Sequence, residues 1–260
     1  MELDLGGKIA LVSGSSRGIG KEIAKTLAIE GCRVYLNGRT ESTLQASVDE
    51  IRESTSNPHV RGICCDLTET AAIRDALSGI MKETGRWPGL IVASIGTGRS
   101  VSGWDIDDVE WERMFSLNFF GAVRLTREAV RIFKDSGGGS IVCIASIAGC
   151  DAVAAPVPYS TAKTALISFV KNTADTAARH GVRINAVSPG NVFFEGGTWD
   201  LKMKENRDAV MEYIGKAVPM NGFATPNDVA DITAYLLSER ARFITGANFI
   251  VDGGQVRKCI

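Results

Sequence analysis

The chain of 260 residues carries 29 Lys and Arg side chains against 30 Asp and Glu, which gives a formal net charge of -1. Without a block of like charge it offers no patch for nucleic acid or for an anionic membrane surface, so neither is an expected partner. The six cysteines form no Cys-x-x-Cys pair, the two histidines lack metal-ligand spacing, and the start, MELDLGGKIALVSG, has no secretory pattern. We therefore expect a reduced, cytoplasmic protein without a metal site.

Short apolar runs alternate along the chain with longer segments of helical periodicity. The apolar runs predict strands at 8–13, 33–37, 59–65, 89–94, 140–146, 182–188 and 248–252. The periodic segments predict helices near 18–30, 41–54, 69–84, 107–135, 158–180 and 226–238. Strands this apolar are covered on both faces, so the pattern predicts an α/β fold with a doubly wound, seven-stranded parallel sheet flanked by helices on both faces. The length and the 45% of hydrophobic residues favour a single domain over 1–260.

A glycine-rich loop follows the first predicted strand and precedes the first predicted helix. Gly14 allows a tight turn, Gly18 allows the backbone to approach a pyrophosphate, and Gly20 allows the helix to pack on the strand. Phosphates are expected at the helix N-terminus, where free N–H groups and the helix dipole favour negative charge. The loop therefore predicts Rossmann-type dinucleotide binding by residues 14–20, which are Gly14, Ser15, Ser16, Arg17, Gly18, Ile19 and Gly20.

The second predicted strand ends at Asn37-Gly38-Arg39, where an NAD-binding fold would place an acid for the ribose 2'-hydroxyl. Arg39 and Arg17 can instead place two guanidinium groups around a 2'-phosphate, which favours NADP(H). NAD(H) stays open, because both arginines can also be ordinary solvated loop residues. Asp66, followed by Leu67, can accept a hydrogen bond from the adenine amino group, or it can cap the helix that begins near Glu69.

Tyr159 and Lys163 lie four residues apart in a predicted helix and therefore share one face. A nearby ammonium lowers the pKa of a phenol by roughly 2 to 3 units in a partly dry site, which makes the phenol a usable acid or base. The alternative is an exposed pair on an amphipathic helix.

Together with the glycine loop, several motifs in a fixed order resemble the compact, single-domain short-chain dehydrogenase/reductase family, and in particular its members similar to 3-oxoacyl-[acyl-carrier-protein] reductases. Asn118 lies 28 residues before Ser146, which lies 13 before Tyr159. The other motifs are Cys64-Cys65-Asp66-Leu67, Tyr159-x-x-x-Lys163, Pro189-Gly190 and the run TGANFIVDGG at 245–254. The resemblance covers nearly the whole chain.

This resemblance implies an NADP(H)-dependent oxidoreductase that transfers hydride between nicotinamide and a carbonyl or secondary alcohol, and that assembles as a homotetramer or a dimer. Ser146 would bind the substrate oxygen, and Tyr159 would give or take the proton. Lys163 would depress the tyrosine pKa and bind the nicotinamide ribose, while Asn118 would order a water that links Lys163 to solvent. Further contacts to the cofactor would come from Asn37, Leu67, Gly96, Pro189, Gly190 and Val192.

The chain departs from the family pattern at three places. Ala93-Ser94-Ile95-Gly96 replaces the common Asn-Asn-Ala-Gly, Phe194 stands near a common Thr, and Gly222 stands near a common Arg. The segment 191–222 breaks the alternation of strands and helices, and we expect a substrate lid there with a helix from 199 to 217.

The small-molecule substrate is expected between the segments 95–104, 147–157 and 191–205. The candidate substrate contacts are Arg99, Ser146, Phe193, Phe194 and Trp199. A 3-oxoacyl thioester, a sugar, a steroid-like ketone and another small ketone remain open as substrates. The rival hypothesis is a catalytically silent nucleotide-binding regulatory or scaffold protein of the same fold.

Overall fold

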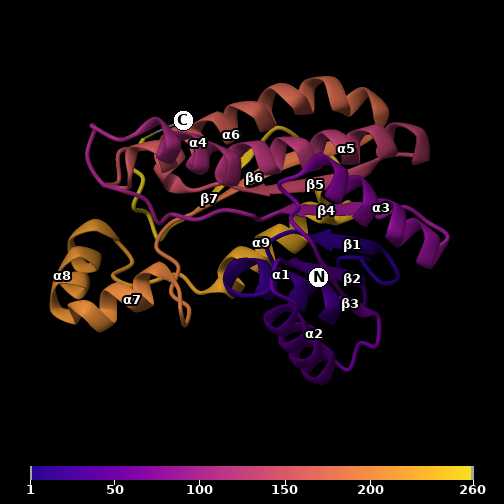
Figure 1. The fold of residues 1–260 in the computed structure, drawn as a ribbon, viewed down its shortest axis with the longest axis horizontal. Helices are drawn as coiled ribbons and strands as arrows, with labels where there is room; N and C mark the ends of the chain where they lie inside the picture. Colours follow the sequence, from indigo (N-terminus) through magenta and orange to yellow (C-terminus); the bar gives the residue numbers. More distant parts are fainter. Residues whose placement is uncertain (1, 259–260) are drawn as a thin grey trace.

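The computed structural model describes residues 2–258 and shows one parallel sheet between two layers of helices (Figure 1). The strand order is β3-β2-β1-β4-β5-β6-β7, which confirms the predicted Rossmann-type architecture. The strands are β1 (Ile9–Val12), β2 (Arg33–Gly38), β3 (Val60–Cys64), β4 (Leu90–Ala93), β5 (Gly139–Ile144), β6 (Val182–Pro189) and β7 (Asn248–Val251). Each lies within two residues of its predicted bounds.

Alternate residues of each strand enter different halves of the core. In β1, Ala10 and Val12 pack on the side of α1 (Gly18–Ile29), α2 (Glu41–Thr55) and α9 (Pro226–Leu237). Ile9 and Leu11 point to the other side, which is covered by α3 (Thr70–Thr84), α5 (Gly121–Ser136) and α6 (Val157–Ala177). The sheet therefore has no solvent-facing side at β1, which is why this strand is apolar at every position.

The strand order reverses beside β1, because the chain runs outward through β2 and β3 and then returns to β4 on the opposite side of β1. The loops after β1 and β4 therefore diverge and leave a crevice at the carboxyl ends of the strands. The glycine-rich loop lies in this crevice, between β1 and α1.

The long helix predicted over 107–135 is interrupted. It consists of α4 (Asp108–Phe115), a π-helical turn at Ser116–Phe120 and α5. The side chain of Asn118 lies inside this turn and is fully buried. A π-helical turn shifts the register of the side chains by one residue, and such turns are frequent at functional sites.

The single helix predicted over 199–217 is also wrong, because two helices are present, α7 (Thr198–Glu205) and α8 (Arg207–Ala217). Asn206 has extended backbone angles between them, and its Oδ1 accepts a hydrogen bond from the Ala209 backbone N–H at 3.1 Å. Asparagine favours such a capping position over a helix interior. Figure 1 shows this helical pair, α7–α8, projecting beyond the sheet.

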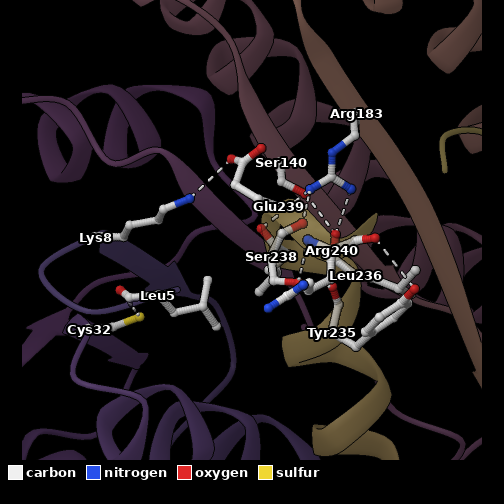
Figure 2. Close-up of polar contacts among 11 residues, drawn as sticks. Leu5, Lys8, Cys32, Ser140, Arg183, Tyr235, Leu236, Ser238, Glu239 and Arg240 are labelled. Carbon is white, nitrogen blue, oxygen red and sulfur yellow. Dashed lines mark hydrogen bonds and ion pairs between the residues drawn. The ribbon is translucent and has the colours of Figure 1, made fainter. Parts of the chain in front are cut away.

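The amino-terminal end of β6 is joined to α9 by Arg183 (Figure 2). Its guanidinium donates to the carbonyl oxygens of Leu236 at 2.6 Å, Ser238 at 2.9 Å and Leu237 at 3.3 Å. These are the carbonyls that the end of α9 leaves without helical partners, and a cation at a helix C-terminus is also favoured by the dipole. Arg183 thus fixes α9 against the sheet, and α9 in turn packs on α1 behind the glycine loop.

Among residues 2–258, no helix is both long and apolar enough to span a lipid bilayer.

Candidate active site

The glycine-rich loop is shaped by close backbone contacts. Gly14 and Gly18 have φ angles of 61° and 59°, a region that side-chain-bearing residues rarely adopt. A Cβ on Gly20 would lie 2.5 Å from the Gly14 carbonyl oxygen, so only glycine lets α1 start this close to the turn. Arg17, between them, has an exposed side chain.

Ser15 and Asn37 are buried and support the loop from beneath. The Ser15 hydroxyl donates to the Val12 carbonyl oxygen at 2.7 Å and accepts from the Asn37 backbone N–H at 2.8 Å. The Asn37 amide donates to the carbonyls of Ile63 and Cys65, both at 3.0 Å, and its Oδ1 accepts from the Gly14 N–H at 3.3 Å. These two side chains bind the ends of β1, β2 and β3 together beneath the glycine-rich loop.

Asp66 faces Arg39 across the ends of β2 and β3. Arg39 Nη1 lies 3.9 Å from Asp66 Oδ2, and both side chains are exposed. Asp66 Oδ1 accepts hydrogen bonds from the backbone N–H and the hydroxyl of Thr68, at 2.9 and 2.7 Å. Burial opposes ionisation of Asp66, but these bonds and Arg39 outweigh it and hold its pKa below the usual value. Asp66 therefore caps the turn before α3, whose own N-cap is Glu69. Leu67 beside it is fully buried.

Tyr159 and Lys163 extend from α6 toward the end of β5. Lys163 Nζ donates to the Ile144 carbonyl oxygen at 2.8 Å and lies 5.9 Å from the centroid of the Tyr159 ring. The lysine side chain is buried, and this burial lowers its pKa to about 8. Ser146 directly follows β5, and its Oγ accepts a hydrogen bond from the Ala148 N–H at 3.1 Å.

The lowered pKa that the sequence predicted for Tyr159 is not found. Burial raises the pKa of its phenol, while hydrogen bonding with Ser146 acts in the opposite direction and is the smaller effect. The physical reason is the position of Lys163, whose ammonium is bonded to a backbone carbonyl and lies beside the ring. The sequence places the two residues on one face of a helix but does not fix where the ammonium points.

Asn118 connects the π-helical turn to the loop after β4. Its Oδ1 accepts from the Thr97 backbone N–H at 2.9 Å, and its Nδ2 donates to the Met114 carbonyl oxygen at 3.1 Å. A Cβ on Gly96 would lie 2.7 Å from Asn118 Oδ1 and 3.3 Å from Lys163 Nζ. The loop can therefore approach these two side chains only because residue 96 is glycine.

A cavity of about 650 Å³ joins these groups. Its walls come from the three segments predicted for the substrate side, from the glycine-rich loop and from the residues Pro189, Gly190 and Val192. Arg99, Ser146, Phe194 and Trp199 line it, whereas Phe193 packs on Phe223 with ring centroids 5.7 Å apart and does not. The helical pair α7–α8 adds Lys202, Asn206 and Tyr213, which the sequence did not single out because the direction of these helices could not be inferred from it.

Phe194 lies between the glycine-rich loop and the start of α7. Its ring atoms would be 2.7 Å from a Cβ on Gly18 and 3.0 Å from one on Gly197, so glycine at both positions makes room for the ring. The aromatic side chain of Phe194, near the position of the expected threonine, thus packs directly on the glycine-rich loop.

Comparisons with known proteins agree over nearly the whole chain. A family model described as "Enoyl-(Acyl carrier protein) reductase" matches residues 14–255. The 3-oxoacyl-[acyl-carrier-protein] reductase of Escherichia coli (strain K12) is 31% identical, over 95% of this chain and 97% of the relative. The D-threitol dehydrogenase of Mycolicibacterium smegmatis is 30% identical, over 98% and 95% of the two chains.

Among solved structures, L-sorbose reductase from Gluconobacter frateurii, complexed with NADPH and L-sorbose, superposes with a TM-score of 0.92. It is 26% identical, and the match covers 100% of both chains. The sheet order, the glycine-rich loop and the full-length sequence matches lead to one conclusion: the chain belongs to the short-chain dehydrogenase/reductase family.

Proposed function

We propose that this chain is an NADP(H)-dependent oxidoreductase that interconverts a carbonyl and a secondary alcohol, with Tyr159 as the general acid and base. The supporting observation is that Tyr159, Ser146 and Lys163 line one cavity with the glycine-rich loop. The nicotinamide supplies the hydride when the cofactor is bound. The residues present fit a dinucleotide, because Gly14, Arg17, Ile19 and Gly20 of the glycine-rich loop line the same cavity as Ser146, Tyr159 and Lys163.

The chain's own residues supply position and a proton. Ser146 Oγ binds the substrate oxygen and holds it beside the Tyr159 hydroxyl, which donates the proton during reduction. Because its pKa is raised, Tyr159 is protonated throughout the neutral range. Lys163 uses one N–H for the Ile144 carbonyl and has two left for the hydroxyls of the nicotinamide ribose. Asn118 orders a water through which the proton that Tyr159 donates is replaced from solvent.

The coenzyme preference rests on charge at the end of β2. Arg39 and Arg17 are exposed, and β2 does not end in an acidic residue that would repel a 2'-phosphate. The relative L-sorbose reductase was solved with NADPH, which supports the same choice here. We place the adenine amino group at Asp66, whose Oδ2 accepts no hydrogen bond from the described residues.

We further propose a lid function for 191–222, a cytoplasmic setting and a homotetramer. The described cysteines are all free, as in a reducing compartment. Phe120 on the π-helical turn is 43% exposed and Ile250 on the edge strand β7 is 37% exposed, and we propose that these apolar side chains take part in subunit contacts. The relatives' names span sugars, polyols and 3-oxoacyl thioesters, and these remain the candidate substrate classes.

Replacing Tyr159 with Phe tests the proposed chemistry. We expect kcat to fall by about 10²- to 10⁴-fold, because only the proton donor is lost, while the Kd for NADPH changes less than about twofold. Turnover is measured with NADPH on a panel of a 3-oxoacyl thioester, a ketose, an oxo-steroid and an enoyl thioester. Tyr235→Phe, on α9, is the matched control. Retained activity in Tyr159→Phe would refute the assignment, and a wild-type protein that binds NADPH but reduces nothing would favour the silent scaffold.

The pH dependence of kcat/KM should reflect the ionisation of Lys163. Its pKa is lowered to about 8, so its ammonium is present below that pH and is lost above it. In the reductive direction we expect kcat/KM for NADPH to be flat below about pH 8 and to fall above it, since this parameter reports groups of the free enzyme. Lys163→Met should give a low rate without this limb. If Lys163→Met showed the same fall of kcat/KM at high pH, that fall would belong to another group.

Gly96→Ala should disturb the site without removing a titrating group. The new Cβ would displace Asn118 and Lys163, and we expect a loss of roughly 100-fold in kcat, as for displacements of about 1 Å at a reacting centre. Gly89→Ala, in the loop before β4, is the control, because a Cβ there would have no neighbour within 4 Å. Equal kinetics for the two variants would show that the contact at residue 96 has no role.

Arg39→Ala should change coenzyme choice. Loss of a charge-assisted contact to the 2'-phosphate should reduce kcat/KM for NADPH by about 10- to 100-fold and leave NADH unaffected. The control is Arg61→Ala, on β3, whose side chain faces Glu83. Equal effects on the two coenzymes would contradict the NADP(H) preference.

A further inference from the structure

A lysine ammonium is held on an aromatic platform at the α7–α8 side of the cavity. Lys202 Nζ lies 4.7 Å from the centroid of the Trp199 ring, one turn earlier on α7. Trp199 stacks on Tyr213 of α8, with centroids 5.5 Å apart and ring planes at 16°. All three side chains line the cavity. A cation–π contact of this kind orients the ammonium before any ligand arrives.

The charge of Lys202 is not neutralised by neighbouring acids. Within residues 2–258 it takes part in no ion pair, whereas Asp200 binds Lys204 at 2.8 Å and accepts from the Gly196 N–H at 2.9 Å. Glu205 is the one acid among the described residues of the cavity wall, and it forms no ion pair with Lys202. The ammonium is therefore available to an anion.

A second cation reaches the same cavity from the loop after β4. Arg99 Nη2 donates to the Gly196 carbonyl oxygen at 3.0 Å, which brings its guanidinium to the start of α7, and four of its five donors are free for other partners. The same cavity has a small apolar wall of Val153, Ala154, Ala155 and Pro156. The substrate half of the cavity thus combines two cations, one acid and apolar surface, and its net positive field attracts anions.

We propose that this chain acts on a carbonyl compound that carries a carboxylate, and that Lys202, reinforced by Arg99, binds this carboxylate. The carbonyl oxygen then lies at Ser146 and Tyr159, and the carbon chain lies along the apolar wall. This inference rests on the proposed oxidoreductase function and specifies its substrate class as oxo acids and the corresponding hydroxy acids. Lys202 is a specificity residue, because it contacts the substrate away from the reacting atoms.

Matched acids and esters test the inference. The probes are 4-oxopentanoate, 5-oxohexanoate and 6-oxoheptanoate with their methyl esters, each reduced with NADPH. For at least one chain length we expect the wild-type kcat/KM to be about 10-fold or more higher for the acid than for its ester. Lys202→Gln should raise KM for that acid by about 10-fold and leave KM for the ester unchanged, since the ester has no charge for the ammonium to bind. The control is Lys216→Gln, because Lys216 pairs with Glu212 on α8.

A binding measurement separates this inference from the proposed function. In the Tyr159→Phe background, calorimetry with 5-oxohexanoate in the presence of NADP⁺ should show about 10-fold weaker binding when Lys202→Gln is added. The inference would be overturned if kcat/KM were equal for each acid and its ester, or if the Kd for 5-oxohexanoate were the same with and without Lys202. Either result would leave the oxidoreductase function intact. A higher Kd for NADPH in Lys202→Gln would also overturn it, because the ammonium would then serve a cofactor phosphate. Undiminished turnover in Tyr159→Phe would instead reject the proposed function.

Discussion

The buried ammonium of Lys163 constrains the whole site. A cation in a dry interior is costly unless hydrogen bonds replace its water, and here the carbonyl of Ile144 at 2.8 Å does so. That bond joins α6 to the end of β5, so the helix cannot shift along the sheet without exposing or abandoning the charge. The helix also lies so close that a Cβ on Gly149 would be 2.7 Å from the Lys163 carbonyl carbon. Because α6 is fixed in this way, Tyr159, one turn earlier on the helix, is held beside Ser146.

The cavity wall comes from two kinds of structure. Ser146, Tyr159 and Lys163 lie after β5 and on α6, whereas α7–α8 has a small core of its own, formed by Val210, Ile214 and Val218. The pair is tied to the sheet by a bridge between Val192 and Ala224 and by Gln255, which bonds Asn191 at 2.8 Å and Tyr213 at 3.0 Å. A unit attached in this way can change its cavity-lining residues without disturbing the sheet. This division is consistent with relatives whose names span a polyol and a 3-oxoacyl thioester at about 30% identity.

The sheet and most helices could be predicted because their causes are local. An apolar run too short for a helix and bounded by polar segments forms a buried strand, and the predicted and observed strands agree within two residues. The two helical errors have causes that periodicity does not contain. The π-helical turn around Asn118 shifts the side-chain register by one residue within a continuous helical segment, and the break at Asn206 depends on one side-chain cap. The buried bonds of Asn37 to Ile63 and Cys65 also could not be predicted, because they depend on three strands meeting.

The fold class, the glycine-rich loop and the helix face shared by Tyr159 and Lys163 follow from the sequence alone, because spacing along one strand or helix sets each of them. The pKa values of these two side chains depend on the tertiary structure. Burial raises the pKa of Tyr159 and lowers that of Lys163, and neither shift can be derived from a spacing of four residues. The same holds for Lys202 and Arg99. They lie 103 positions apart in the sequence and become one charged wall only when α7 folds over the loop after β4.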